Sequence, residues 1–548
     1  MMCPICLQDH GPLVHYFPNP SDGPTVEALR AELPGWQPES GACTRCVDQA
    51  QLAACQRNPG DRHRLGGQER MGYTILPIPA RLSAHTGYTG KGVTICFIDS
   101  GFVRHPDLCE PDNRILRMFD IRWPEEPIRA DSSGEPAAAC WHGTMTAVTG
   151  AGNGWCSAGY YRSLAPDAQV VLIRVMDDAG VISDQALADA LQWVCTHHAA
   201  YGIRIVNLSV SGDNSLSYKA SPVGQRIAAL AAEGVLVVAA AGNQAGAALK
   251  APANAPHALT VGGLDDHNTL FPLGHTLYHS TYGETADHTY KPDLIAPAIW
   301  LAAPLLPGSA AQREAEALWS IQEASPRHRH AVLTNTIHQT KLSRQLLLAP
   351  AEALEQAIAA RMESAKYISP HYQHADGTSF AAPIVCSVAA QLLEARPDLS
   401  PAALRDILLR TARPLPGVPA ERQGFGVLHP LSAVTLAAED DHPLPPLFHP
   451  VVDYHARQVH FYFHHETCNS VQLAGGFDGW KKPGRPLVMT AEHHWTVTLD
   501  LPAPGVYPYK FMVNNQDWVT DTRNLYQVPD GLGGFHSLLV VDTYGAEY

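Results

Sequence analysis

The sequence offers little positive charge to a polyanion. Its 38 lysines and arginines are outnumbered by 53 aspartates and glutamates, and the net charge is −15. Nucleic-acid-binding proteins need a basic face, so we expect no nucleic-acid partner. No uncharged apolar run approaches the roughly 20 residues that span a bilayer. The first residues, MMCPICLQDH, contain no basic stretch followed by an apolar one. We therefore expect neither a membrane span nor a secretory signal.

A disulfide framework of the secreted type is also missing. Of the twelve cysteines, four form two CxxC pairs, and others lie inside apolar runs, as Cys96 does in VTICFID. Disulfides persist mainly in secreted proteins, whereas thiols persist in reducing compartments. The cysteine pattern therefore predicts a cytoplasmic protein.

The chain is too long for a single hydrophobic core. Its 548 residues are 45% hydrophobic and 17% charged, which is typical of globular domains. Changes in composition predict three parts: a small module over residues 1–65, a large domain over 66–440 and a C-terminal domain over 441–548.

Two cysteine pairs bracket most of the N-terminal module. Cys3 and Cys6 form CPIC, and Cys43 and Cys46 form CTRC, on either side of a segment rich in proline and glycine. Four thiolates in two such pairs suit a closed structural Zn²⁺ site. The metal would also stabilise a module whose own core is small. A redox-active CxxC or an incidental pairing is the alternative.

Short apolar runs alternate with helical stretches from about residue 70. Runs such as GVTICFID, AQVVLIRVM and IRIVNLSV are typical of strands buried on both faces. One helical stretch has Ser183 as its predicted N-cap and Gly202 as its stop. This order predicts an α/β domain with a mainly parallel sheet and helices on both faces. Its active site is expected at the carboxyl ends of the strands.

A segment over about residues 300–370 interrupts the alternation. It is rich in alanine, glutamine and glutamate, and after Pro350 it places Leu354, Ile358 and Met362 at helical spacing. We interpret it as a helical insertion; a linker with marginal helices is the alternative. Long insertions near an active site are usually functional, so we expect a lid, a partner surface or a latency device.

Three polar residues stand where such a domain places catalytic groups. Asp99 ends a buried run, His142 begins the stretch HGTMTAVTGAG, and Ser379 lies in DGTSFAAP, where a helix is expected to begin. A serine hydroxyl becomes a nucleophile when a neighbouring base takes its proton, and a histidine oriented by a carboxylate is such a base. Each residue alone is explained as well by a helix cap or a turn, so the prediction depends on all three together.

Together with Asn243 in AAAGN, these segments resemble those of the subtilisin-like serine peptidases. The resemblance covers about residues 70–435 and includes HPDL, LAPDAQVVLIRV, IVNLSVSG and KPDLIAPA in the family order. It implies a serine endopeptidase with Asp99, His142 and Ser379 as its triad. It also implies that Asn243 donates a hydrogen bond to the oxyanion.

The same resemblance implies a substrate cleft between two segments of small residues. Their backbones would pair with an extended peptide, although close packing explains small residues equally well. The positions are Ser209, Val210, Ser211, Gly212, Ala240, Ala241 and Gly242.

The chain departs from the family pattern in three places. Met145 replaces a usual second histidine, which we expect to alter the wall beside His142. No inhibitory pro-segment is recognisable, and the cysteine-rich module occupies its place. The stretch GNGWCSAGYYRS has no set of carboxylates, so the sequence does not support a calcium site.

Alternating aromatic-rich segments after about residue 440 predict a small all-β, immunoglobulin-like sandwich. Over about residues 450–541 they resemble the glycogen-binding modules of kinase beta subunits and branching enzymes. The resemblance implies glucan binding by Trp480, Trp518 and Lys510, with Ser537 at the position of a usual asparagine. A protein-docking or spacer module is the alternative.

The sequence therefore predicts a serine endopeptidase acting on proteins or peptides. It also predicts structural zinc, and a C-terminal module that binds either glucan or a protein partner. The rival interpretation is a latent or non-catalytic scaffold that uses the fold for interaction. The intact set of Asp99, His142, Ser379 and Asn243 argues against that rival.

Overall fold

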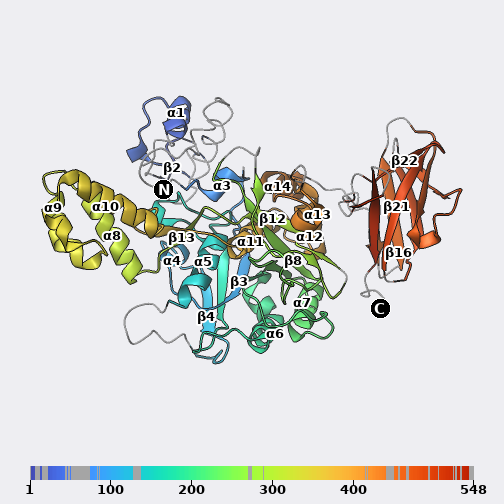
Figure 1. Ribbon diagram of the computed structural model, residues 1–548, viewed down its shortest axis with the longest axis horizontal. Helices are drawn as coiled ribbons and strands as arrows, with labels where there is room; N and C mark the ends of the chain where they lie inside the picture. Colours follow the sequence, from blue (N-terminus) through green and yellow to red (C-terminus); the bar gives the residue numbers. More distant parts are fainter. Residues whose placement is uncertain are drawn as a thin grey trace.

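The computed structural model places the large domain in the middle (Figure 1). The insertion helices lie at one end of the long axis, and the C-terminal sandwich lies at the other. The residues that it describes are 2–5, 13–14, 23–43, 46, 50, 75–82, 84–85, 87–126, 138–269, 275–287, 289–413, 415, 418–439, 450–453, 457–464, 468–491, 494–503, 505–521, 524, 527–530 and 534–541.

A mainly parallel sheet forms the centre of the large domain, which confirms the predicted fold class. The strand order is β12-β8-β7-β6-β3-β5-β4, and every neighbouring pair along this path is parallel. Strand β9 adds to β8 in the antiparallel sense. The strands are β3 (Thr94–Asp99), β4 (Ile115–Asp120), β5 (Gln169–Arg174), β6 (Ile203–Leu208), β7 (Leu236–Ala240), β8 (Ala258–Asp265), β9 (Thr276–Leu277) and β12 (Leu294–Pro297).

Side chains that alternate along each strand divide the buried residues into two cores. In β3, Ile95 and Phe97 belong to one core, whereas Cys96 and Ile98 belong to the other, and all four are fully buried. Burial on both faces explains the continuous apolar runs in the sequence. The first core is covered by α5 (Cys140–Ala151), α11 (Thr378–Ala395), α12 (Pro401–Thr411) and α14 (Pro430–Glu439), and the second by α6 (Asp184–Tyr201) and α7 (Pro222–Ala232).

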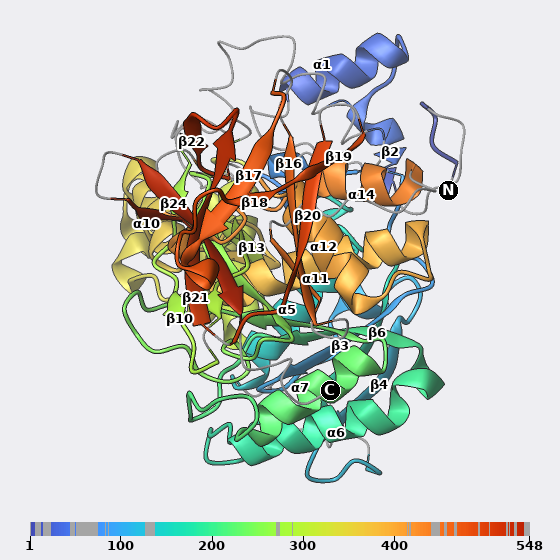
Figure 2. The same cartoon turned by 90° about the vertical axis from the view of Figure 1, so that its right-hand side faces the viewer.

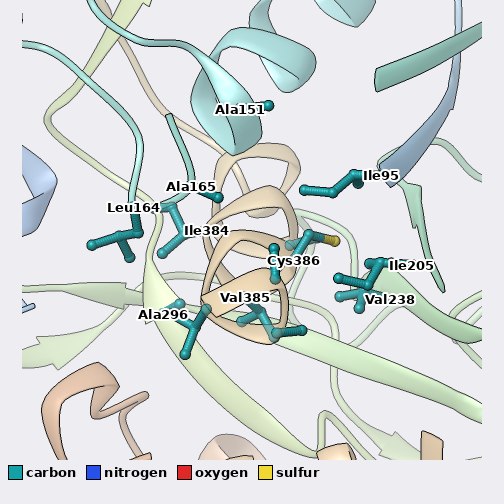
Figure 3. Close-up of a cluster of buried hydrophobic side chains, with 14 of the residues drawn as sticks. Ile95, Ala151, Leu164, Ala165, Ile205, Val238, Ala296, Ile384, Val385 and Cys386 are labelled. Atoms are coloured by element: carbon teal, nitrogen blue, oxygen red, sulfur yellow. The ribbon is translucent and has the colours of Figure 1, made fainter. Parts of the chain in front are cut away.

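Helix α11 runs through the first core. Figure 3 shows its residues Ile384, Val385 and Cys386 among side chains that come from strands β3, β6 and β7. Among the described residues, α11 alone is long and apolar enough to cross a membrane, and 83% of it is buried inside the domain. The apolar composition of this helix therefore fits its place in the core.

The predicted ends of α6 are confirmed. The Ser183 side chain accepts a hydrogen bond from the Ala186 N–H, and the helix stops at Gly202, whose φ is 63°. A side-chain oxygen satisfies an N–H that the first turn leaves without a partner. Glycine adopts the left-handed conformation of the C-terminal cap without steric cost.

The insertion is a small helical subdomain with its own core. Strands β13 (Leu301–Pro304) and β14 (Tyr372–Ala375) pair antiparallel at its base. Leu354, Ile358 and Met362 are buried in its core, on the helix where the sequence places them. Between the two strands lie α8 (Ala310–Glu323), α9 (Arg329–Thr336), η5 (Ile337–Gln339), η6 (Arg344–Leu348) and α10 (Ala351–Ser364).

The C-terminal part consists of two antiparallel sheets, in the orders β15-β16-β20-β19 and β18-β17-β21-β24-β23, with β22 paired to β21 (Figure 2). Phe461, Tyr509 and Phe511 lie fully buried between them. The strands are β15 (Val451–Asp453), β16 (Gln458–His464), β17 (Val471–Gly475), β18 (Arg485–Pro486), β19 (Val488–Ala491), β20 (His494–Asp500), β21 (Gly505–Val513), β22 (Asp517–Val519), β23 (Gln527–Pro529) and β24 (Phe535–Val541).

The N-terminal module packs Leu29 and Trp36 against Cys3 and Cys46 in a small core. Its elements, together with the remaining short ones, are β1 (Leu13–Val14), α1 (Gly23–Glu32), η2 (Pro38–Ser40), β2 (Ala42–Cys43), α3 (Ile78–Arg81), α4 (Pro106–Cys109), η4 (Trp155–Ser157), β10 (Gly283–Glu284), β11 (Tyr290–Lys291), α13 (Ala420–Gln423) and η7 (Gly476–Asp478).

Candidate active site

Asp99 is the last residue of β3 and is fully buried. Its Oδ1 accepts a hydrogen bond of 2.6 Å from the Ser100 N–H, and its Oδ2 lies 3.4 Å from the Thr146 hydroxyl. A buried carboxylate is costly unless hydrogen bonds satisfy it. These contacts fix the Asp99 side chain at the carboxyl end of the sheet.

His142 lies in the first turn of α5, between the other two members of the predicted triad. Its Nδ1 is 2.6 Å from Asp99 Oδ1, and its Nε2 is 3.0 Å from Ser379 Oγ. The helix approaches this closely because residue 143 is glycine: a Cβ there would lie 2.3 Å from the Gly101 carbonyl oxygen. The fold thus joins three side chains that lie far apart in the sequence.

The electrostatics of His142 favour its protonated form. Burial lowers the pKa of the imidazole, but the charge of Asp99 and its hydrogen bond outweigh burial, so the pKa rises from its ordinary value of 6.5. An imidazole in this position is a stronger proton acceptor than a free one. The arrangement suits a general base that must briefly hold a proton.

Ser379 is presented by the N-terminus of α11. Gly377 precedes the helix with φ 144°, a conformation that side chains seldom allow. Thr378 donates to Asn243 Oδ1 twice, from its N–H at 2.8 Å and from its hydroxyl at 2.9 Å. These two bonds orient the Asn243 amide: its oxygen faces Thr378, and its NH₂ group is the end that can donate to a ligand. The sequence analysis did not predict that Thr378 binds Asn243, although Thr378 directly precedes Ser379.

The first predicted substrate segment follows β6, and the second begins at Ala240, the last residue of β7. Ser209 lies against the candidate nucleophile: its hydroxyl donates to the Ser379 carbonyl oxygen at 3.1 Å, and its own carbonyl oxygen lies 3.2 Å from Ser379 Oγ. Three N–H groups of the segments are engaged inside the fold, those of Gly212, Ala241 and Gly242. The predicted pairing with an extended peptide would therefore use the other backbone groups of these two segments.

Met145 lies on α5, three residues after His142. It is 1% exposed and belongs to the first core. Its side chain therefore packs in that core, and the expectation that it alters the wall beside His142 stays a prediction.

The predicted zinc ligands fall partly outside the described residues. Cys6 and the side chain of Cys43 are not described, whereas Cys3 and Cys46 are buried, with their sulfur atoms 3.9 Å apart. Two thiolates bound to one tetrahedral Zn²⁺ at about 2.3 Å would be separated by about 3.8 Å. The pair therefore fits a shared zinc ion.

The predicted carbohydrate residues meet on the outer face of the second sandwich sheet. The rings of Trp480 and Trp518 are 6.2 Å apart, and that of Trp480 lies 4.9 Å from His536. Lys510 Nζ donates to Asp530 Oδ2 at 2.6 Å. One of the three ammonium N–H bonds is thereby used.

Ser537 faces the opposite side. It is fully buried, and its hydroxyl accepts a hydrogen bond from the Asp521 N–H at 2.9 Å. Successive residues of a strand point to opposite faces, so the polar residue of β24 beside the tryptophans is His536. The expectation that Ser537 stands at the sugar-facing position is corrected accordingly.

Two family models match separate parts of the chain. The Subtilase family model matches residues 90–427, and the model of the glycogen recognition site of AMP-activated protein kinase matches residues 458–545. The serine protease AprX of Bacillus subtilis is 25% identical over 329 residues, which cover 58% of this chain and 61% of the relative. Subtilisin Savinase of Lederbergia lenta is 29% identical over 194 residues, 35% of this chain and 64% of the relative.

The chain thus spans less than two thirds of these relatives. Among solved structures, fervidolysin from Fervidobacterium pennivorans is 19% identical with a TM-score of 0.45, covering 79% of this chain and 54% of that one. This similarity is too low to carry an argument, and the assignment depends on the family model. Because that model matches more than half of the residues, the chain belongs to the subtilase family.

Proposed function

We propose that the chain is a serine endopeptidase that uses Asp99, His142 and Ser379 as its triad. The observation that supports this most strongly is the continuous hydrogen-bond chain from Asp99 Oδ1 through His142 to Ser379 Oγ. Such a chain is the arrangement that activates a serine hydroxyl for acyl transfer.

The proposed reaction follows from the positions of these groups. Ser379 Oγ attacks the peptide carbonyl while His142 Nε2 takes its proton, and Asp99 holds the ring and stabilises the imidazolium. The Asn243 NH₂ group and the Ser379 N–H donate to the oxyanion that develops. His142 then protonates the leaving amine, and water hydrolyses the acyl-enzyme by the reverse steps.

A fluorophosphonate serine-hydrolase probe tests this proposal. Wild-type protein is expected to be labelled, and the Ser379→Ala variant is expected not to be. A folded wild-type protein that stays unlabelled would support the rival function, a latent or non-catalytic scaffold that uses the peptidase fold for binding.

The pH dependence of kcat/KM is expected to report the raised pKa of His142. The base must be neutral, so activity rises with pH through the folded-state pKa, which lies above 6.5. Asp99→Asn removes the charge that raises this pKa, so it should lower both the midpoint and kcat, the latter by about 10⁴-fold. A wild-type midpoint at or below 6.5 would contradict the prediction.

We also propose a reducing, cytoplasmic environment. Cys96 and Cys386 are thiols in the two cores of the large domain, each 0% exposed. Burial raises the pKa of both thiols, which keeps them protonated and unreactive. Protein or peptide substrates are expected there, with no part for nucleic acid or membrane.

The C-terminal module is proposed to target the enzyme to glucan. Trp480 and Trp518 offer flat apolar faces to sugar rings. Burial and the charge of Lys510 lower the pKa of His536, so its neutral imidazole can both donate to and accept from a hydroxyl. A protein partner on the same face is the alternative, and binding to polysaccharide distinguishes the two.

Substituting either tryptophan is expected to weaken retention on amylopectin. Loss of one stacking ring in Trp480→Ala or Trp518→Ala should raise Kd about tenfold, equivalent to about 1.4 kcal/mol. Trp123→Ala is the matched control, because Trp123 is an exposed indole of the catalytic domain, 49% exposed. If wild-type protein is not retained, or if the control loses as much binding, the glucan proposal is wrong.

A further inference from the structure

The base of the insertion reaches the residues next to the catalytic groups. Strand β13 begins directly after Trp300, and β14 ends directly before Asp376, with Leu301 opposite Ala375. Trp300 and Asp376 therefore flank the ladder where it joins the catalytic domain. Asp376 is also three residues before Ser379, so the chain leaves the insertion and enters the nucleophile turn at once.

The Asp376 carboxylate receives contacts from the neck of the insertion. Its Oδ1 accepts from His374 Nε2 at 2.6 Å and from the Trp300 N–H at 3.2 Å, and its Oδ2 lies 3.5 Å from Lys366 Nζ. Burial raises the pKa of Asp376, but the His374 hydrogen bond, the charges and the Trp300 N–H outweigh it and lower the pKa. The group is thus an anion that draws both ends of the insertion together.

The aromatic part of this neck is held in an unusual conformation. Trp300 has φ 59°, in the left-handed region, and its ring stacks on His374 at 4.8 Å with an interplanar angle of 7°. Non-glycine residues persist in this region only when the surroundings over-determine them, and they are concentrated at functional sites. The stack fixes the imidazole that binds Asp376.

The other side of the neck contacts the histidine helix and the domain core. Trp141, next to His142, donates from Nε1 to the Pro304 carbonyl oxygen of β13 at 2.9 Å. Tyr372 of β14 is fully buried and donates its hydroxyl to Asp107 Oδ2 at 2.6 Å. The β13–β14 ladder is therefore anchored in the domain. It contacts the helix that carries His142, and it leads directly into the turn that carries Ser379.

We propose that Asp376 is a positioning residue through which the insertion holds the turn that presents Ser379. Gly377 has no side chain with which to restrict its own backbone, and its N–H donates to the Ala298 carbonyl oxygen at 2.6 Å, from the segment that leads to Trp300. The Asp376 carboxylate makes a second link between the same segment and the turn, because it accepts the Trp300 N–H. The inference rests on the proposed function, because it concerns the geometry of that nucleophile.

A kinetic comparison of Asp376 variants tests the proposal. Asp376→Ala is expected to lower kcat, and the rate of fluorophosphonate labelling, about tenfold, because small misplacements of a reacting group slow chemistry more than binding. KM is expected to change less than about twofold, on the same reasoning. Asp376→Asn keeps an acceptor for Trp300 and His374 and should recover most of the rate.

Glu355→Gln is the matched control. It neutralises another carboxylate of the insertion, one that pairs with Arg329 on α9 and does not adjoin the nucleophile turn. Its rate should equal that of the wild type. If Asp376→Ala fails to fold, His374→Gln replaces it, since it removes the imidazole that binds the same oxygen, and the same loss of kcat is expected.

The outcomes separate this inference from the proposed function. Wild-type kcat in the folded Asp376→Ala or His374→Gln variant would overturn the inference alone. Equal losses in Asp376→Ala and Glu355→Gln, or a failure of asparagine to restore the rate, would also overturn it. Absence of labelling in the wild-type protein would instead overturn the proposed function.

Discussion

Replacing Ser379 with alanine is expected to lower kcat by about 10⁶-fold, and replacing His142 as well to lower it no further. The reason is that the two side chains act as one unit. Without the hydroxyl at 3.0 Å from His142 Nε2, the base has no nucleophile to activate, and without the base the hydroxyl is a weak nucleophile. Steady-state hydrolysis of a peptide substrate, with probe labelling in parallel, measures the effect.

The Ser364→Ala variant is the control for the first prediction. Ser364 is an exposed serine of the insertion whose hydroxyl donates to a backbone carbonyl, so wild-type rates are expected. Losses that multiply in the Ser379→Ala, His142→Ala double variant would mean that the two residues act independently. That result would contradict the proposed triad even if each single variant were impaired.

Removing zinc is expected to unfold the N-terminal module and to leave the catalytic domain folded. We propose that Cys3, Cys6, Cys43 and Cys46 hold one Zn²⁺, and the 3.9 Å separation of the Cys3 and Cys46 sulfur atoms supports this. Structural zinc sites contribute apparent free energies of about 10–16 kcal/mol at neutral pH. The small core around Leu29 and Trp36 cannot replace that contribution.

Elemental analysis and limited proteolysis measure this effect. Purified protein should contain about one zinc per chain, the Cys46→Ser variant should lose most of it, and chelation should expose residues 1–65 to protease. Cys195→Ser, which changes a half-buried cysteine of α6, should retain the metal. Iron in place of zinc, or metal-free protein with a protease-resistant module, would contradict the proposal.

The ends of α6 and the buried strands were predictable because each leaves a signal within a short stretch of sequence. Ser183 caps its helix through an N–H three residues away, and Gly202 ends it through its own backbone freedom. The four residues from Ile95 to Ile98 in β3 are all apolar because both faces of the strand are covered. Each of these signals is complete within a few consecutive residues.

Side-chain direction was less predictable in the sandwich. Ser537 and His536 are neighbours in sequence, yet one is buried against Asp521 and the other lies beside Trp480. A strand alternates its faces with a period of two, so an alignment shifted by one residue exchanges core and surface. Only the pairing of β24 with β21 and β23 decides which of the two residues lies on the outer face of the sheet.

The sequence by itself determined the fold class, the family and the three residue types of the candidate triad, since these follow from apolar periodicity and from short motifs in order. The tertiary structure alone decided that Thr378 orients Asn243, that Met145 is buried, and that Asp376 joins the insertion to the nucleophile turn. These contacts link residues that are tens to hundreds of positions apart or depend on which way one side chain points. They exist only after the sheet has brought the carboxyl ends of its strands together.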